Sequence, residues 1–323
     1  MSRLIDRMFS CHFRITSTMP ARAASELGRI LQRLRPHVLS RLEHAQVIVI
    51  DNVANYFYAG TDQEEWSWDE DFPCVAPPFE TFWMEMLSPH TIVSRVHGVL
   101  HDNTLHAVGT LVEGIDLDSR QTHAAVALAA ALGMPSTTKW LLHFAMFAET
   151  RKGHIYPLGF RLMALDKHGA MACPGDPPRR DIVNITLGPA EISRLIDTLS
   201  LPFGLALTFL HCRNVVMVER QAPADAQRAR EQRRRRPLFR YHVLEIEPLK
   251  RVLAVEGNAA EVGLRRALHI CRGHFKDYRQ RGLFGKHRGI YWWESYVRGE
   301  LHSGVVTKDY EVSPLAAATG GIP

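Results

Sequence analysis

Residues 79–112 read FETFWMEMLSPHTIVSRVHGVLHDNTLHAVGTLV and contain three apolar runs separated by turn signals. The runs Phe79–Met86, Thr91–Leu100 and Leu105–Val112 are rich in β-branched and aromatic residues, and a Ser-Pro and an Asp-Asn pair lie between them. Apolar runs bounded by Pro, Ser, Asp and Asn are typical of strands joined by turns. The stretch therefore predicts an antiparallel meander.

Helical periodicity appears on both sides of this meander. The apolar residues of 22–46 recur at steps of three and four and predict a helix that Pro36 bends or divides. Residues 121–149 predict one or two further helices, and Gly188-Pro189 opens a helix over about 190–211 that Pro202 splits. Short strands are expected at 47–50, 155–165 and 215–218.

The last third predicts a separate small module. Residues 221–237 form a polar linker, and three strand-like segments follow at 239–246, 268–275 and 290–297. The expected fold class is α+β, with N-terminal helices, an antiparallel β meander and a small basic C-terminal β module. The expected domains are an α+β domain at 1–220, a basic linker at 221–237, a basic aromatic β module at 238–312 and a disordered tail at 313–323.

The composition is that of a folded protein rather than of a membrane or disulfide-rich one. Of 323 residues, 46% are hydrophobic and 23% charged, and no apolar run is long enough to span a bilayer. No signal peptide is apparent, and the five cysteines form no CxxC pair. We therefore expect a protein of the reducing cytoplasm that does not associate with a membrane.

Basic residues concentrate in one region. Residues 228–298 hold 18 Lys and Arg against 7 Asp and Glu, whereas the rest of the chain holds 21 against 27. Within this region, residues 268–299 read LHICRGHFKDYRQRGLFGKHRGIYWWESYVRG and mix cations with aromatic rings. That mixture is typical of surfaces that bind phosphate or RNA, because cations neutralise phosphates and rings stack on bases.

We name residues 268–299 the basic aromatic cassette. It and the arginine run before it supply the candidate residues for binding a nucleic acid or another partner. These are Arg233, Arg234, Arg235, Arg236, His269, Arg272, His274, Lys276, Tyr278, Arg279, Lys286, Arg288, Trp292 and Arg298. The plainer interpretation is a solvated basic face over a β core, since alternate residues of a strand face opposite sides.

Two other chemistries use the same histidines. His269 and His274 are candidate catalytic residues of a metal-independent ribonuclease, although an offset of five along one strand places them on opposite faces. His269, Cys271, His274 and His287 match no common zinc spacing, so no metal site is predicted. The glycines at 282 and 285 lack the spacing of a phosphate-binding loop, and no cofactor is expected.

An acidic aromatic loop gives a second candidate surface. Residues 61–73 read TDQEEWSWDEDFP and place six carboxylates around Trp66 and Trp68. These tryptophans are candidate anchors for a basic peptide. A solubilising loop, or one that docks on the chain's own basic region, is the alternative.

The cassette also resembles a known C-terminal signature. His269, Arg272, Gly273, His274 and Phe275, followed by Trp292, Trp293, Val297 and Arg298, are similar to the H-x-x-R-G-H-aromatic core and terminal aromatic strand of phage- and plasmid-borne proteins. That group includes the family of large anti-CRISPR proteins directed against the type V-A effector. The resemblance implies a module associated with translation or RNA and assigns no catalytic residue.

Together these features favour a non-enzymatic regulator encoded by a mobile element. Its basic region would bind RNA or the ribosome, and its N-terminal part would bind a protein or nascent peptide to lower expression of a target. A ribonuclease using His269 or His274 and a structural interaction protein without a nucleic-acid role are the alternatives.

Overall fold

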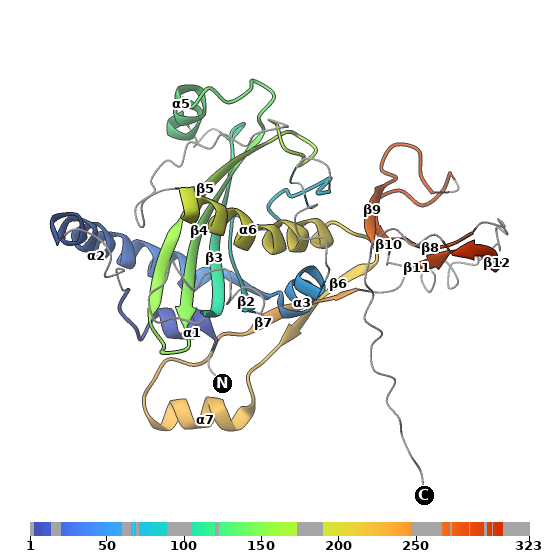
Figure 1. Ribbon diagram of the computed structural model, residues 1–323. Helices are drawn as coiled ribbons and strands as arrows, with labels where there is room; N and C mark the ends of the chain where they lie inside the picture. The colour runs from blue at the N-terminus through green and yellow to red at the C-terminus, as the bar shows by residue number, and fades with distance from the viewer. Residues whose placement is uncertain are drawn as a thin grey trace, which may run out of the picture. The chain divides into compact units, whose positions relative to one another are not determined.

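The computed structural model describes residues 3–13, 21–59, 66, 68, 71–88, 105–119, 123–172, 190–246, 267–271, 273–283, 285–293, 296–298 and 300–305 (Figure 1). These residues belong to two compact units. The first comprises Met1–Glu247 and Phe275–Trp292, and the second comprises Pro248–His274 and Trp293–Pro323.

A mixed sheet of seven described strands forms the frame of the first unit, in the order β5-β4-β3-β2-β1-β7-β6. Strands β2 to β5 pair antiparallel in chain order, β1 runs parallel to both β2 and β7, and β7 pairs antiparallel with β6. The strands span Gln46–Val49 (β1), Thr81–Leu87 (β2), Leu105–Asp116 (β3), Trp140–Thr150 (β4), Ile155–Leu165 (β5), Val215–Arg220 (β6) and Tyr241–Ile246 (β7).

Side-chain alternation in β2 shows how the sheet separates two cores. Phe82, Met84 and Met86 enter one apolar cluster, whereas Trp83 enters the other. The Trp83 ring lies where a side chain on Gly109 of β3 would sit, so a glycine is required there. Both faces of the sheet are therefore buried, and each needs a cover of helices.

Two pairs of helices provide these covers (Figure 1). On one face, α3 (Asp51–Ala59) contributes Phe57 and α6 (Ala190–Leu210) contributes Phe203 to the larger cluster. On the other, α1 (Leu4–Met8) and α2 (Ala21–His44) contribute residues such as Leu4 and Leu42. The two remaining described helices are α5 (His123–Ala131) and α7 (Ala224–Gln232).

The prediction of helix over 140–149 is wrong, because this segment is β4, a strand at the centre of the antiparallel half. Its burial pattern leaves only Trp140 and His143 partly exposed. A strand buried on both faces reads as a continuous apolar run, which periodicity alone does not distinguish from a buried helix. The antiparallel meander is β2 to β5 rather than the three runs of 79–112.

The helix break expected at Pro202 and the expected linker differ from the structure. Pro202 lies inside α6, which continues through it, and Pro36 lies inside α2 without dividing that helix. Residues 221–237 contain α7 and connect β6 to β7, which are paired neighbours in the seven-stranded sheet. The strand predicted at 91–100, the loop at 173–181 and the tail at 313–323 lie outside the described residues.

The cassette divides between the two units. Its predicted strands at 268–275 and 290–297 are each broken in two, and the break in the first falls beside Gly273, a residue that weakens strands. Strand β9 (His274–Asp277) pairs with β10 (Ile290–Trp293), and all but the end residues His274 and Trp293 belong to the first unit. In the second, β8 (Ala267–Cys271) lies between β11 (Tyr296–Arg298) and β12 (Glu300–Val305).

Strand β10 is built into the main core of the first unit. The buried side chain of Asn214 donates to the carbonyl of Trp292 at 3.1 Å and accepts from its amide at 3.0 Å. The Trp292 ring packs edge-on against Phe209 of α6 at 5.0 Å. Residues 275–292 therefore complete a core that is otherwise formed by residues of Met1–Glu247.

No helix in the described part of the chain combines the length and apolar character needed to cross a lipid bilayer.

Candidate polyanion-binding site

The segment between β6 and β7 presents the densest group of exposed arginines among the described residues. Six of the 13 residues from Ala224 to Arg236 are arginines, against the carboxylates Asp225 and Glu231. The run is rich in Ala, Gln, Glu and Arg, which favour helix, and Pro223 precedes its first turn. None of the residues of α7 is buried. We name residues 223–239 the arginine hairpin.

Side-chain hydrogen bonds hold the two arms of this hairpin together. The Gln227 amide group donates to the Leu238 carbonyl at 3.1 Å and accepts from the Leu238 amide at 2.9 Å. Arg230 Nε donates to the Arg236 carbonyl at 2.7 Å. Helix and return segment are thus fixed to each other on either side of Arg233–Arg235.

Arg236 anchors the hairpin to the body of the first unit. Its guanidinium carbon lies 3.9 Å from the ring centre of Phe9 and 4.1 Å from that of Phe239. Burial lowers the pKa of Arg236, against the attraction of Glu43 and Asp6. Arginine stacks on aromatic faces through its planar group, so this contact fixes the base of the hairpin while its tip stays in solvent.

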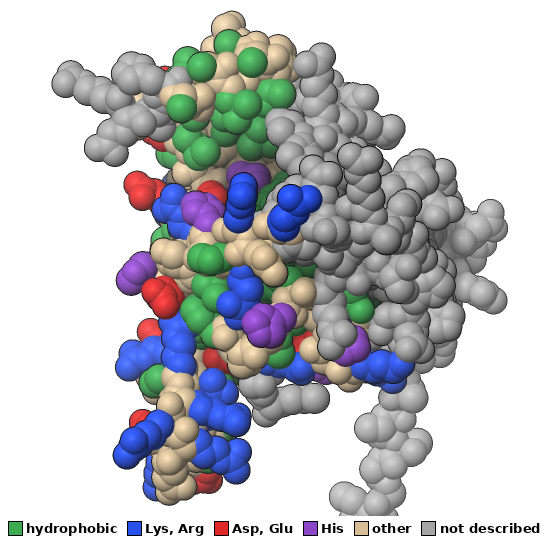
Figure 2. Space-filling view, turned by 90° about the vertical axis from the view of Figure 1, so that its left-hand side faces the viewer, with side chains coloured by type: hydrophobic (Ala, Val, Ile, Leu, Met, Phe, Trp, Pro, Cys, Tyr) green, Lys and Arg blue, Asp and Glu red, His purple; other side chains and the backbone are tan. Residues whose placement is uncertain are grey.

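The tip consists of three exposed arginines, Arg233, Arg234 and Arg235. Arg234 has a φ of 51°, a left-handed conformation that costs energy in a residue with a Cβ. No side chain of the described residues forms an ion pair with any of the three. Figure 2 shows blue side chains gathered at the lower end of this face, at the height of α7 in Figure 1.

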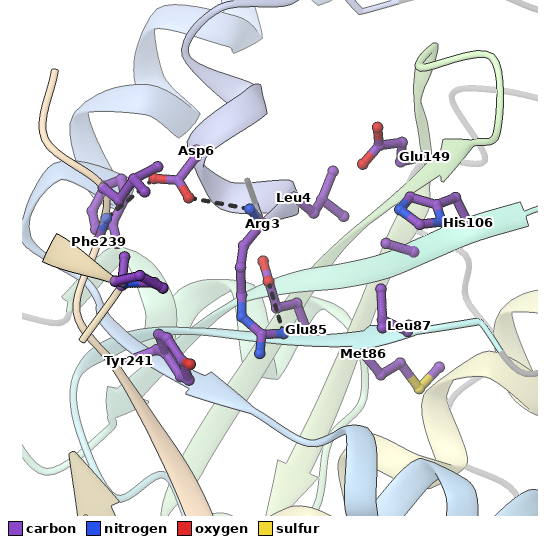
Figure 3. A pocket seen from close by; sticks show the side chains of 14 residues that line it. Arg3, Leu4, Asp6, Glu85, Met86, Leu87, His106, Glu149, Phe239 and Tyr241 are labelled. Carbon is purple, nitrogen blue, oxygen red and sulfur yellow. Dashed lines mark hydrogen bonds and ion pairs between the residues drawn. The ribbon is translucent and has the colours of Figure 1, made fainter. Parts of the chain in front are cut away.

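A pocket of about 190 Å³ lies at the base of the hairpin (Figure 3). Its walls come from α1, the ends of β2 to β4 and the hairpin residues Pro223, Leu238 and Phe239. Arg3 Nη1 lies 3.7 Å from Glu85 and 3.2 Å from Asp51, while Asp6 accepts from the amides of Arg3 and Phe239 at 3.2 and 3.1 Å. These polar groups bind one another and tie α1 to the sheet and the hairpin.

Three carboxylates of this region are protonated more readily than usual. Burial raises the pKa of Glu85 to about 7, against hydrogen bonds from Trp83 and Ile5 and the charge of Arg3. Burial likewise raises the pKa of Asp6 and of Glu149, which Arg7 contacts. The pocket is therefore less negative near neutral pH than its composition indicates.

The cassette residues in the first unit have diverse surroundings. Arg279 binds both oxygens of Asp277, at 2.7 and 3.0 Å, and donates to the carbonyls of His168 and Pro73. Arg279 therefore links its own segment to those that contain His168 and Pro73, which is a structural role. Lys276 and Tyr278 are half-buried, and burial raises the pKa of Tyr278. Lys286 and Arg288 are exposed, as their predicted role requires.

Two predicted aromatic contacts are core residues instead. Trp292 is 2% exposed, so its ring has no free face for a base. Trp68 is 8% exposed and packs against Phe72 and Phe144. Trp66 is half-buried and stacks on Phe72 at 5.8 Å. The tryptophans of the acidic loop thus pack inward, because moving an apolar indole ring from water into the core is favourable.

The remaining predicted residues lie mostly in the second unit. His269 is on β8 opposite Arg298 of β11, whereas His274 begins β9 in a different sheet. Arg272 lies outside the described residues, as do the side chains of His269 and Arg298. Among the described residues no cluster of three His, Cys, Asp or Glu side chains is arranged to hold a metal ion.

The sequence pointed to the arginine run but not to its supports. Phe9 is 227 residues from Arg236 along the chain, and Gln227 was part of a stretch interpreted as linker. The Ala- and Gln-rich composition after Pro223 was the signal that could have predicted α7.

Comparison with known proteins yields no match, whether with family models, with curated proteins or with solved structures.

Proposed function

We propose that this protein is a non-enzymatic, RNA-binding regulator of gene expression, and that Arg233, Arg234 and Arg235 are its primary contacts with RNA. The observation that carries the proposal is the arginine hairpin, in which three exposed guanidinium groups stand on an anchored base. Arginine is suited to phosphate because its planar group donates two parallel hydrogen bonds.

Preorganisation supports RNA binding over a merely solvated charge run. A flexible run loses conformational freedom when it binds, and that cost reduces affinity. Here Gln227, Arg230 and Arg236 already restrict the backbone on both sides of the tip. The exposed cations Lys286 and Arg288 belong to the same unit and are secondary candidates.

The finer parts of the proposal draw on the C-terminal resemblance. The similarity of residues 269–275 and 292–298 to proteins of phages and plasmids supports a mobile-element regulator that acts in the cytoplasm of a bacterial host. In this scheme the N-terminal residues recognise a protein or nascent peptide, and RNA or ribosome contact brings the protein to its target. The small C-terminal β sheet would be part of that basic module.

RNA binding and its salt dependence test the proposal directly. The variant Arg233→Gln/Arg234→Gln/Arg235→Gln should weaken binding of a labelled single-stranded RNA about tenfold or more in fluorescence anisotropy. Each lost contact with a single-stranded phosphate removes about 0.7 from the slope of log affinity against log salt. Loss of all three should therefore lower the slope by about 2.

A matched control separates the site from overall charge. Arg29, Arg33 and Arg151 are also exposed, and changing all three to Gln removes the same net charge. We expect the control to keep most of the wild-type affinity and slope. If both triple variants bind RNA equally, or if the wild type does not bind RNA at low salt, the proposal is wrong.

A further inference from the structure

The pocket at the base of the arginine hairpin is lined by two buried glutamates. Glu85 of β2 is 3% exposed and Glu149 of β4 is 1% exposed. One oxygen of each carboxylate has a partner: Glu85 Oε2 accepts from Ile5 and Trp83, and Glu149 Oε1 pairs with Arg7. Buried carboxylates accept hydrogen bonds on both oxygens as a rule, so the second oxygens call for a donor.

The second oxygen of each carboxylate has no donor among the described residues. Arg3 Nη1 lies 3.7 Å from Glu85 Oε1, which is too long for a hydrogen bond. No described side chain or amide donates to Glu149 Oε2. Figure 3 shows the Glu149 carboxylate pointing from its strand toward Leu4 of α1. The pocket therefore offers two carboxylate oxygens to the molecule that occupies it.

The sheet register places an apolar surface between the two carboxylates. Leu87 of β2 is paired with Ala107 of β3, and Ala107 is paired with Glu149 of β4. Glu85 lies two residues before Leu87, and side chains two apart on a strand face the same side of the sheet. All four residues line the pocket. The site thus has an acid at each end and apolar side chains between them.

Acidic groups outnumber basic groups in the described lining of the pocket. The acids are Asp6, Glu85 and Glu149, and the bases are Arg3 and His106. Arg3 already forms an ion pair at 3.2 Å with a carboxylate outside the pocket. Burial raises the pKa of each of the three acids, so nearby cations do not fully compensate for the loss of water. A cation inside the pocket would supply that compensation.

We propose that this pocket binds a short aliphatic diamine, with one ammonium group on Glu149 and the other on Glu85. The methylene chain lies over Leu87 and Ala107, and each ammonium donates to the carboxylate oxygen that has no other donor. A cavity of about 150 Å³ holds benzene. The volume of about 190 Å³ here suits a molecule of similar size, such as 1,4-diaminobutane. None of these four residues belongs to the arginine hairpin, so the proposal does not depend on RNA binding.

Isothermal titration calorimetry of the whole chain with 1,4-diaminobutane tests the proposal. At pH 8 and low salt, where Glu85 with its pKa of about 7 is mostly ionised, the dissociation constant should be below about 1 mM. Butylamine has the same chain with one ammonium and should bind about tenfold more weakly. The uncharged 1,4-butanediol should not bind. The net charge of +5 repels cations, so general attraction does not produce this pattern. Equal binding of diol and diamine, or no binding of the diamine, would overturn the proposal.

Glu149→Gln removes the charge at one end of the site while keeping its shape. The variant should bind the diamine at least tenfold more weakly. Glu80→Gln, which changes an exposed carboxylate before β2, is the matched control and should bind like wild type. Because Glu149→Gln also removes the partner of Arg7, urea unfolding is used to show that the variant is folded. Wild-type affinity in folded Glu149→Gln would contradict the assignment.

Ala222→Phe tests the pocket without changing any charge. Ala222 is half-buried and lines the pocket, so a phenyl ring there should fill it and abolish binding of the diamine. Ala229 is exposed on α7 and does not line the pocket, so Ala229→Phe should bind like wild type. If both variants bind normally, the diamine binds elsewhere and the proposal is wrong.

A lysine side chain of a partner protein carries the same ammonium group. A blocked tripeptide with a central lysine distinguishes this source from a free diamine. We expect the peptide to bind at least tenfold more weakly than 1,4-diaminobutane, because it has one ammonium and its peptide groups exceed the volume of the pocket. Binding as tight as that of the diamine, or tighter, would overturn the assignment to a free small molecule.

Discussion

Glu85 is a carboxylate on a strand whose neighbouring residues are nearly all apolar. It is 3% exposed, and its Oε2 accepts from the amide of Ile5 at 2.9 Å and from the Trp83 indole at 2.8 Å. Both donors need an acceptor, which explains a polar residue at this point of β2. Burial outweighs these two hydrogen bonds and the charge of Arg3, which lies 3.7 Å away, and the pKa of Glu85 therefore rises to about 7.

This shift makes stability depend on pH. The folded protein retains a proton on Glu85 between its ordinary pKa near 4.5 and about 7, where the unfolded chain has lost it. The contribution to stability is thus complete below pH 4.5 and is lost as pH rises through 7. Glu85→Gln cannot ionise and keeps an acceptor, so its stability relative to wild type should increase by roughly 3 kcal/mol between pH 4 and 8.

Urea unfolding of both proteins across this range measures the difference. Glu80→Gln, which changes an exposed carboxylate before the same strand, is the control and should show no comparable trend. A constant difference between Glu85→Gln and wild type at all pH values would show that Glu85 titrates alike in the folded and unfolded chain.

At the scale of elements, specific side-chain contacts, rather than burial in the core, hold α7 and its return segment in place. Gln227→Ala removes both hydrogen bonds to Leu238 but changes no charge. We expect faster hydrogen exchange at the Leu238 amide and RNA affinity reduced about three- to tenfold, because binding must then order the loop. The salt slope should remain that of wild type, since the number of phosphate contacts is unchanged.

Gln232→Ala is the matched control, because Gln232 is an exposed glutamine at the end of the same helix. It should affect neither exchange at Leu238 nor affinity. A reduced salt slope in Gln227→Ala would mean that the hairpin loses phosphate contacts rather than preorganisation.

Sequence patterns predicted three elements well. The α2 stripe, β5 at 155–165 and the helix after Pro189 were found where periodicity placed them. Strand β4 was mistaken for helix because both of its faces are buried. For the candidate site, local composition indicated Arg233–Arg236, whereas the stacking of Arg236 on Phe9 depends on a contact between residues that are 227 positions apart in the chain.

At the scale of the whole molecule, the core of the first unit is complete only when a segment from near the C-terminus packs against residues from earlier in the chain. Residues 275–292 are separated from Met1–Glu247 by residues of the second unit, yet Trp292 and Phe275 pack with Phe209. The sheet and the segment bearing Lys286 and Arg288 should consequently fold as one cooperative structure. Contacts that span the chain in this way also slow folding, because a long loop must close first.

Asn214→Ala tests this cooperativity, because it removes both hydrogen bonds between Asn214 and Trp292 from a side chain that is 1% exposed. The free energy of unfolding should fall by about 2 to 3 kcal/mol. If the first unit is cooperative, the most protected amides of β3, which has no contact with Asn214 in the sheet, should lose the same amount of protection against hydrogen exchange. Asn55→Ala, on the exposed side of α3, should leave both measurements unchanged. Loss of protection confined to β9 and β10, with β3 unaffected, would show instead that residues 275–292 unfold independently of the sheet.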